Sequence, residues 1–99
     1  MTQFNIEEYI NSLPDSVTEI HVPRKNITYL PSLDRFYKLE DLWCSENKLT
    51  RLPVLPSSLK VLFCNNNKLT SLPDLPESLR VLSCNDNQLT SLPNLPDSL

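Results

Sequence analysis

Three cysteines and one histidine are the residues of this chain best suited to metal binding or nucleophilic chemistry. Cys44, Cys64 and Cys84 lie twenty residues apart, and His21 precedes them. Zinc sites in small domains instead bring their cysteines as close pairs, about two to four residues apart. Cysteines at the same position of adjacent copies could have Cα atoms within the range of a disulfide bond. Their side chains would be parallel, however, and in a reducing compartment this favours free thiols. We therefore interpret the cysteines as small buried apolar residues and expect no metal site and no cofactor.

Catalysis by the histidine is also disfavoured by spacing. His21 is the only histidine, and the in-phase Ser83 would lie three strands away, ~14 Å at the usual strand spacing. Proton transfer needs a contact of ~3 Å. The chain has no glycine, which excludes glycine-rich phosphate loops, and its net charge of -3 with nine Lys and Arg disfavours a nucleic-acid binder. We expect a protein that is not an enzyme and binds no nucleic acid.

The regular spacing of the cysteines is part of an internal repeat. Residues 52–71 and 72–91 agree at 14 of 20 positions, and the aligned copies read L-x-x-L-x-(C/V)-x-x-N-x-L-T-x-L-P. The copies start at Val17, Leu39, Leu59 and Leu79, and Leu99 starts a fifth. Position 6 holds the cysteines, and position 9 holds Asn47, Asn67 and Asn87. A period of about twenty residues indicates a solenoid.

This pattern resembles the leucine-rich repeat family over residues 17–99. The L-P-x-L-P-x-S-L segments resemble the short twenty-residue subtype of bacterial type III effectors, and the Asn-rich, Cys-containing copies are similar to repeat proteins of giant DNA viruses. The resemblance implies a right-handed solenoid with a parallel β-sheet on its concave face. Some such effectors append a ubiquitin-ligase domain with a catalytic cysteine, but every cysteine here is a repeat position, so that activity is not implied.

Each copy is expected to contribute one short strand. Side chains at positions 4 and 6 point to one side of it, and the leucines at positions 1, 4, 11 and 14 stack into a core from copy to copy. The L-P-x-L-P run favours an extended, polyproline-like return, with no room for a helix on the convex side. Asparagine at position 9 is expected to bind backbone groups in a ladder, and asparagine turns would replace the missing glycine turns.

Residues 1–16 have a different pattern. Ile6, Tyr9, Ile10 and Leu13 follow helical spacing, and Asn5 with Glu8 three residues later resembles a capping-box start. We predict a short helix that caps the first coil.

The side chains at positions 3 and 5 should point away from the core. Position 5 holds His21, Trp43, Phe63 and Ser83, and position 3 holds Glu19, Asp41, Val61 and Val81. We predict an exposed apolar patch of Trp43, Phe63, Val61 and Val81 on the concave face, with His21 and Asp41 beside it, that binds a partner protein. Lateral stabilisation of the sheet by neighbouring aromatic rings explains the same residues equally well.

The two ends of the chain lead to further expectations. The N-terminus lacks the basic and apolar regions of a secretory signal, and no stretch reaches the length of a membrane span, so we expect a cytoplasmic protein, in the host cytoplasm if it is viral or an effector. The stop at Leu99 leaves no cap on the last coil, which invites further repeats or a second chain. The alternative function is therefore a structural segment of a longer array that acts through residues elsewhere.

Overall fold

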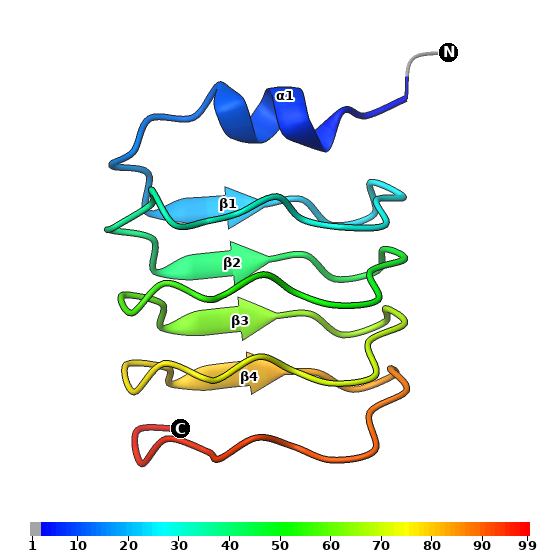
Figure 1. Ribbon diagram of the computed structural model, residues 1–99, viewed down its shortest axis with the longest axis vertical. Coiled ribbons are helices and arrows are strands. Elements are labelled where there is room, and N and C mark those ends of the chain that lie inside the picture. The colour runs from blue at the N-terminus through cyan, green and yellow to red at the C-terminus, as the bar shows by residue number, and fades with distance from the viewer. Residues whose placement is uncertain (1–2) are drawn as a thin grey trace.

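A parallel sheet of short strands runs along the length of the molecule. The computed structural model describes residues 3–99, which form one helix, α1 (Ile6–Asn11), and four strands: β1 (Glu19–His21), β2 (Asp41–Trp43), β3 (Val61–Phe63) and β4 (Val81–Ser83). The strands are parallel and stand in sequence order in one sheet, with α1 across one end and the last coil at the other (Figure 1). This arrangement confirms the solenoid predicted from the repeat.

The register of the sheet equals the repeat period. Glu19 pairs with Asp41, Asp41 with Val61, and Val61 with Val81, and the central residues of the strands pair in the same way. Each of the three strand positions therefore forms a row that crosses all four strands. The central residue points to the core, while the residues on either side of it point to the opposite face.

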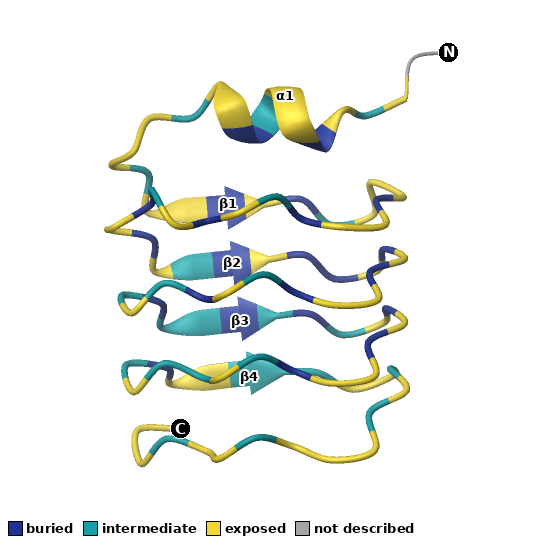
Figure 2. Ribbon diagram, in the orientation of Figure 1, coloured by how far each residue is buried: buried dark blue, intermediate teal, exposed yellow. Residues whose placement is uncertain are grey.

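The core is a column of leucines between the sheet and the return segments. Leu39, Leu42 and Leu49 of the second copy are fully buried, and so are Leu59 and Leu62 of the third. Burial decreases within the fourth copy, where Leu79 is fully buried, Leu82 and Leu89 are only partly buried and Leu92 is 53% exposed (Figure 2). The predicted column of leucines is thus continuous through the third copy and opens toward solvent in the last one.

The asparagines at position 9 connect each coil to the one before it. The backbone N–H of Leu49 donates to Oδ1 of Asn67 over 3.0 Å, and Nδ2 of Asn67 donates to the carbonyls of Cys44 and Cys64 over 3.1 Å each. Asn87 makes the equivalent bonds one coil further on, to Leu69, Cys64 and Cys84. Asn47 bonds the first coil in a related way. These bonds satisfy backbone groups that would otherwise be left unpaired in the turn after each strand.

The left-handed residue of that turn is at position 8 and not at the repeated asparagine. Glu46, Asn66 and Asp86 have φ angles of 57°, 58° and 56°. Asparagine tolerates this conformation, whereas a glutamate there carries a penalty of about 1–2 kcal/mol. The prediction that asparagine turns replace glycine turns is therefore correct at this position only for Asn66. In the other two regular copies an acidic residue is held in the left-handed region by the stacked turns.

The helix α1 covers the first coil. Oδ1 of Asn5 accepts a hydrogen bond from the backbone N–H of Glu8 over 3.1 Å, and Ile6 and Ile10 are buried. Arg35, from the longer first copy, donates to the carbonyls of Ile10 and Leu13. It therefore satisfies carbonyls at the C-terminal end of the helix and fixes the helix to the first coil.

The return segments have no regular secondary structure, as the proline spacing predicts. The three later segments end in a turn closed by a proline carbonyl, for example from the N–H of Leu59 to the carbonyl of Pro56 over 3.1 Å, whereas the first ends with the N–H of Leu39 bonded to the carbonyl of Phe36 over 3.2 Å. The hydroxyl of Ser58 donates to the carbonyl of Leu39 in the preceding coil, and Ser78 repeats this bond to Leu59. Within residues 3–99, no helix has the length and apolarity needed to cross a membrane.

Candidate functional site

The exposed face of the sheet carries a row of rings. His21, Trp43 and Phe63 are paired in register on β1, β2 and β3, and we call them the aromatic row. The ring centroids of His21 and Trp43 are 5.4 Å apart and those of Trp43 and Phe63 are 5.8 Å apart, both in edge-to-face geometry. This is the favourable arrangement for neighbouring rings. Trp43 nevertheless remains 37% exposed.

Two valines extend this apolar surface along the strands. Val61 on β3 lies in register with Val81 on β4, and both belong to position 3. Val61 is half-buried and Val81 is 43% exposed. The structure therefore brings the four apolar residues predicted for this face, Trp43, Phe63, Val61 and Val81, onto adjacent strands of one surface. Their role in binding stays a prediction.

Polar side chains border the aromatic row on the side where the strands end. The hydroxyl of Ser45 donates to Oδ1 of Asn65 over 2.6 Å, and Ser83 donates to Oδ1 of Asn85 over 3.1 Å. Nδ2 of Asn65 in turn donates to the side chain of Asn66. These bonds link the polar side chains at and just after the ends of the strands.

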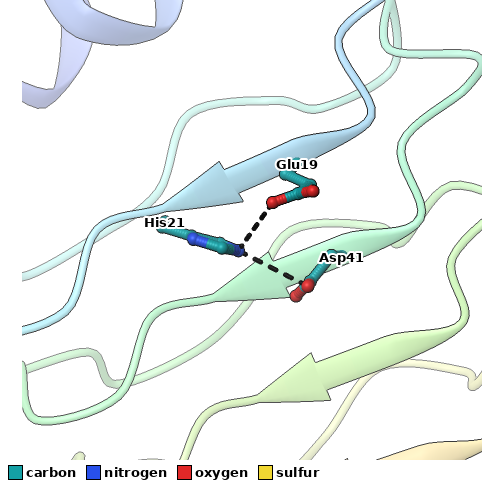
Figure 3. Close-up of side chains that lie close together, drawn as sticks. All are labelled: Glu19, His21 and Asp41. Carbon is teal, nitrogen blue, oxygen red and sulfur yellow. Dashed lines mark ion pairs between the residues drawn. The ribbon is translucent and has the colours of Figure 1, made fainter.

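At the N-terminal end of this face, His21 lies between two carboxylates. Its Nε2 is 3.6 Å from Oε1 of Glu19 and 3.4 Å from Oδ2 of Asp41 (Figure 3). The three residues, the His21 cluster, come from two strands: Glu19 and His21 alternate on β1, and Asp41 pairs with Glu19 from β2. One ligand atom from each lies within 4.8 Å of the others.

Reasoning from the sequence placed these three residues on one face but did not group them. It weighed His21 as a ligand only with the cysteines, which point to the opposite side of the sheet. The signal was present in the repeat alignment, because Glu19 and Asp41 share position 3 and His21 occupies position 5 of the strand that holds Glu19.

Within residues 3–99, no Lys or Arg forms an ion pair with Glu19 or Asp41. Oδ1 of Asp41 is buried and has no hydrogen-bond partner in this part of the chain.

The cysteines are free thiols that line the core. Cys44 and Cys64 are buried and Cys84 is half-buried. Burial raises the pKa of the Cys44 thiol far above its ordinary value, and burial, with a smaller contribution from Cys84, raises that of Cys64 to about 12. A thiol that stays protonated is a poor nucleophile and a poor metal ligand. Ser83 is separated from His21 by β2 and β3, so the structure does not bring these two residues together.

Comparison with known proteins agrees with this architecture. Residues 37–77 match a family model of leucine-rich repeats in two copies. A solved structure of YopM from Yersinia enterocolitica WA-314 is similar to this chain, with 41% identity and a TM-score of 0.84, over 89% of this chain and 19% of the YopM chain. The chain is a leucine-rich repeat solenoid. The match confirms both the predicted repeat and the predicted fold.

The leucine-rich repeat solenoid spans about a fifth of the YopM chain that it matches. No curated protein matches it in sequence. Leucine-rich repeats of this kind generally serve as protein-interaction scaffolds.

Proposed function

We propose that this solenoid is a non-enzymatic protein-interaction module that binds a partner protein on the exposed sheet face, with Trp43 and Phe63 as anchors. The observation that carries the proposal is the aromatic row together with the two valines beside it. His21 and Asp41 lie at the edge of this surface. Apolar surface of this kind, bordered by polar residues, is typical of contact sites.

Lateral stabilisation of the sheet accounts for only part of the aromatic row. Trp43 has a ring on each side, and yet more than a third of it stays exposed. Tryptophan is among the residues that most often contribute a large share of the binding energy at protein interfaces. The ring area that the neighbours leave uncovered is the area that we assign to the partner.

The partner is expected to bind through side chains and not by adding a strand. The backbone groups of β2 and β3 are already paired with the neighbouring strands, for example by the N–H of Cys44 to the carbonyl of Phe63 over 2.8 Å. A partner that covers Trp43 and Phe63 must therefore offer apolar side chains of its own.

We also propose that the protein acts in a reducing, cytoplasmic compartment, where the thiols stay free.

The leucines exposed on the last coil favour a second candidate function. Leu92 and Leu95 are each 53% exposed and Leu99 is 40% exposed. A further coil, or a second chain, would bury them as Leu52 and Leu55 are buried in the second copy. In this candidate function, residues 1–99 are a structural segment of a longer array. A chain that is monomeric by sedimentation and unfolds cooperatively in urea would count against it.

The main proposal is tested by capture from a cell lysate with three versions of the chain side by side. They are the wild type, the double variant Trp43→Ala/Phe63→Ala, and a matched control, Tyr37→Ala/Val54→Ala. The control removes one aromatic and one aliphatic side chain that are 63% and 74% exposed and lie outside the strands. Circular dichroism establishes that all three are folded.

We expect the wild type and the control to retain the same protein and the double variant to lose it. The protein that is retained is then purified and its binding to each version measured by calorimetry. Equal affinity for the double variant and the wild type would refute this site.

A further inference from the structure

We propose that the His21 cluster, Glu19, His21 and Asp41, binds one divalent transition-metal ion, of the Zn²⁺ class, on the exposed sheet face. This site goes beyond the proposed partner binding and reverses the expectation from the sequence that the chain has no metal site.

The distances within the cluster suit metal ligands better than they suit hydrogen bonds. Nε2 of His21 is 3.4 Å from Oδ2 of Asp41 and 3.6 Å from Oε1 of Glu19, which is beyond the usual 2.7–3.2 Å range of an N–H···O bond. Two ligands that each lie about 2.1 Å from a tetrahedral zinc ion are about 3.4 Å apart. The two separations from His21 are close to that value, and the three ligand atoms all lie within 4.8 Å of one another.

The sheet fixes the backbone positions of the three ligands before an ion binds. Glu19 and His21 point to the same side because they alternate on β1, and Asp41 stands directly across from Glu19 on β2 (Figure 3). The N–H of Val22 donates to the carbonyl of Trp43 over 2.7 Å, which ties the strands together beside the cluster. The indole of Trp43 packs against the imidazole of His21. Rigid support of this kind lowers the conformational entropy that binding must overcome.

The charges of the cluster also favour a cation. Two carboxylates face one imidazole, and no Lys or Arg of residues 3–99 pairs with either of them. Asp41 has in addition a buried Oδ1 atom without a partner. An unpaired buried carboxylate oxygen is unfavourable, and a cation bound by the same carboxylate would offset this penalty.

The ligand set selects the class of metal. One imidazole nitrogen and two carboxylate oxygens suit Zn²⁺ and similar first-row ions, whereas Ca²⁺ and Mg²⁺ prefer oxygen ligands alone. Three protein ligands leave a fourth position open. Because the cluster is at the surface, that position is accessible to water or to a ligand atom from a bound protein.

The test is a titration of the full chain with Zn²⁺ alone, followed by calorimetry and by nuclear magnetic resonance, with the thiols kept reduced. His21 is the only histidine, so its ring gives a single set of resonances and reports directly on metal binding. We expect one ion per chain and a shift of the His21 ring signals that saturates at the same ratio.

Substitutions then assign the ligands. His21→Ala, Glu19→Gln and Asp41→Asn should each weaken Zn²⁺ binding by more than the roughly 10–100-fold that loss of an outer-shell contact causes. Glu40→Gln is the matched control, because Glu40 is next to the cluster in sequence and pairs instead with Lys60 over 3.6 Å. It should bind as the wild type does, and so should Cys84→Ser, which removes the most accessible thiol.

Three outcomes would overturn the proposal. The first is the absence of saturable Zn²⁺ binding, which would leave the cluster as three neighbouring polar side chains without an ion. The second is binding that survives in His21→Ala. The third is binding that is lost in Cys84→Ser. None of these outcomes bears on the Trp43 and Phe63 variants that test partner binding.

Discussion

The third and fourth copies of the repeat are nearly the same sequence in two different environments. Residues 52–71 and 72–91 are identical at 14 of 20 positions. Leu62 on β3 is nevertheless fully buried, whereas Leu82 on β4 is only partly buried (Figure 2). Asn67 is buried and Asn87 is half-buried, although they make equivalent hydrogen bonds.

The difference arises from neighbours and not from the residues themselves. β3 has a strand on each side, whereas β4 has β3 on one side only. In a solenoid each copy is stabilised by its own contacts and by its interfaces with the adjacent copies. The same substitution should therefore have a larger effect in the third copy than in the fourth.

The largest contrast is expected for the core leucines. Leu62→Ala removes a fully buried side chain and should lower the free energy of unfolding by about 2–5 kcal/mol. Leu82→Ala should lower the free energy of unfolding by clearly less, because the side chain that it removes is only partly buried and the space left behind is open to solvent. Urea denaturation of the two variants measures both losses. Equal losses would mean that the copies do not differ in the way the burial indicates.

The asparagines of the ladder provide a second contrast. Asn67→Ala leaves the N–H of Leu49 and the carbonyls of Cys44 and Cys64 without their side-chain partner in a buried turn. We expect a loss of about 1–3 kcal/mol. In Asn87→Ala the turn is more exposed, so water replaces part of the bonding and the loss should be smaller. A larger loss for Asn87→Ala, measured by thermal unfolding, would contradict this explanation.

The buried thiols predict how stability changes in alkaline solution. Burial raises the pKa of Cys64 from an ordinary value of 9.0 to about 12 in the folded state. As the pH rises above about 9, the unfolded chain therefore releases this proton before the folded chain does, and stability falls up to a pH of about 12. In this window, the free energy of unfolding of the wild type should fall relative to that of Cys64→Ala by on the order of 1 kcal/mol per pH unit.

Denaturation at a series of pH values measures that slope. The control is Cys84→Ala, which leaves Cys64 in place and should decline in parallel with the wild type. If Cys64→Ala declines just as steeply as the wild type, the buried thiol is not the group responsible.

The smallest expected effect comes from making the two strands alike. Position 5 is Phe63 on β3 and Ser83 on β4, so Ser83→Phe extends the aromatic row by one strand. We expect a gain of about 0.2–1 kcal/mol from the added cross-strand pair. Ser83→Ala is the control for loss of the hydroxyl, and the melting temperatures of the two variants are compared. A gain in the alanine variant equal to that in the phenylalanine variant would rule out ring pairing as its cause.

Much of the fold follows from the spacing of a few residue types. The leucines and asparagines fixed the period, and the period alone predicts which strand positions pair, such as Trp43 with Phe63. The contacts of Arg35 with the end of α1 could not be predicted in this way, because they depend on how the helix and the longer first coil meet. The left-handed turn at position 8 was missed because Glu46 has no preference for that conformation.

The candidate site was predictable in part for the same reason. Alternation along a strand put Trp43, Phe63, Val61 and Val81 on one face, and the structure brings them together there. The His21 cluster needed the pairing of β1 with β2 as well, because two of its members are on one strand and the third is on the next. The repeat alignment gives the pairing of Glu19 with Asp41, but the distances between the side-chain atoms depend on side-chain conformation, which the alignment does not give.

The most direct test of the proposed interaction surface is site-specific photo-crosslinking in cells. A photoreactive phenylalanine analogue is placed at Phe63 on the exposed sheet face or at Val54, which is 74% exposed on a return segment. We predict a covalent adduct with a discrete protein from position 63 and none from position 54. The same adduct from both positions, or an adduct from position 54 alone, would contradict binding on the sheet face.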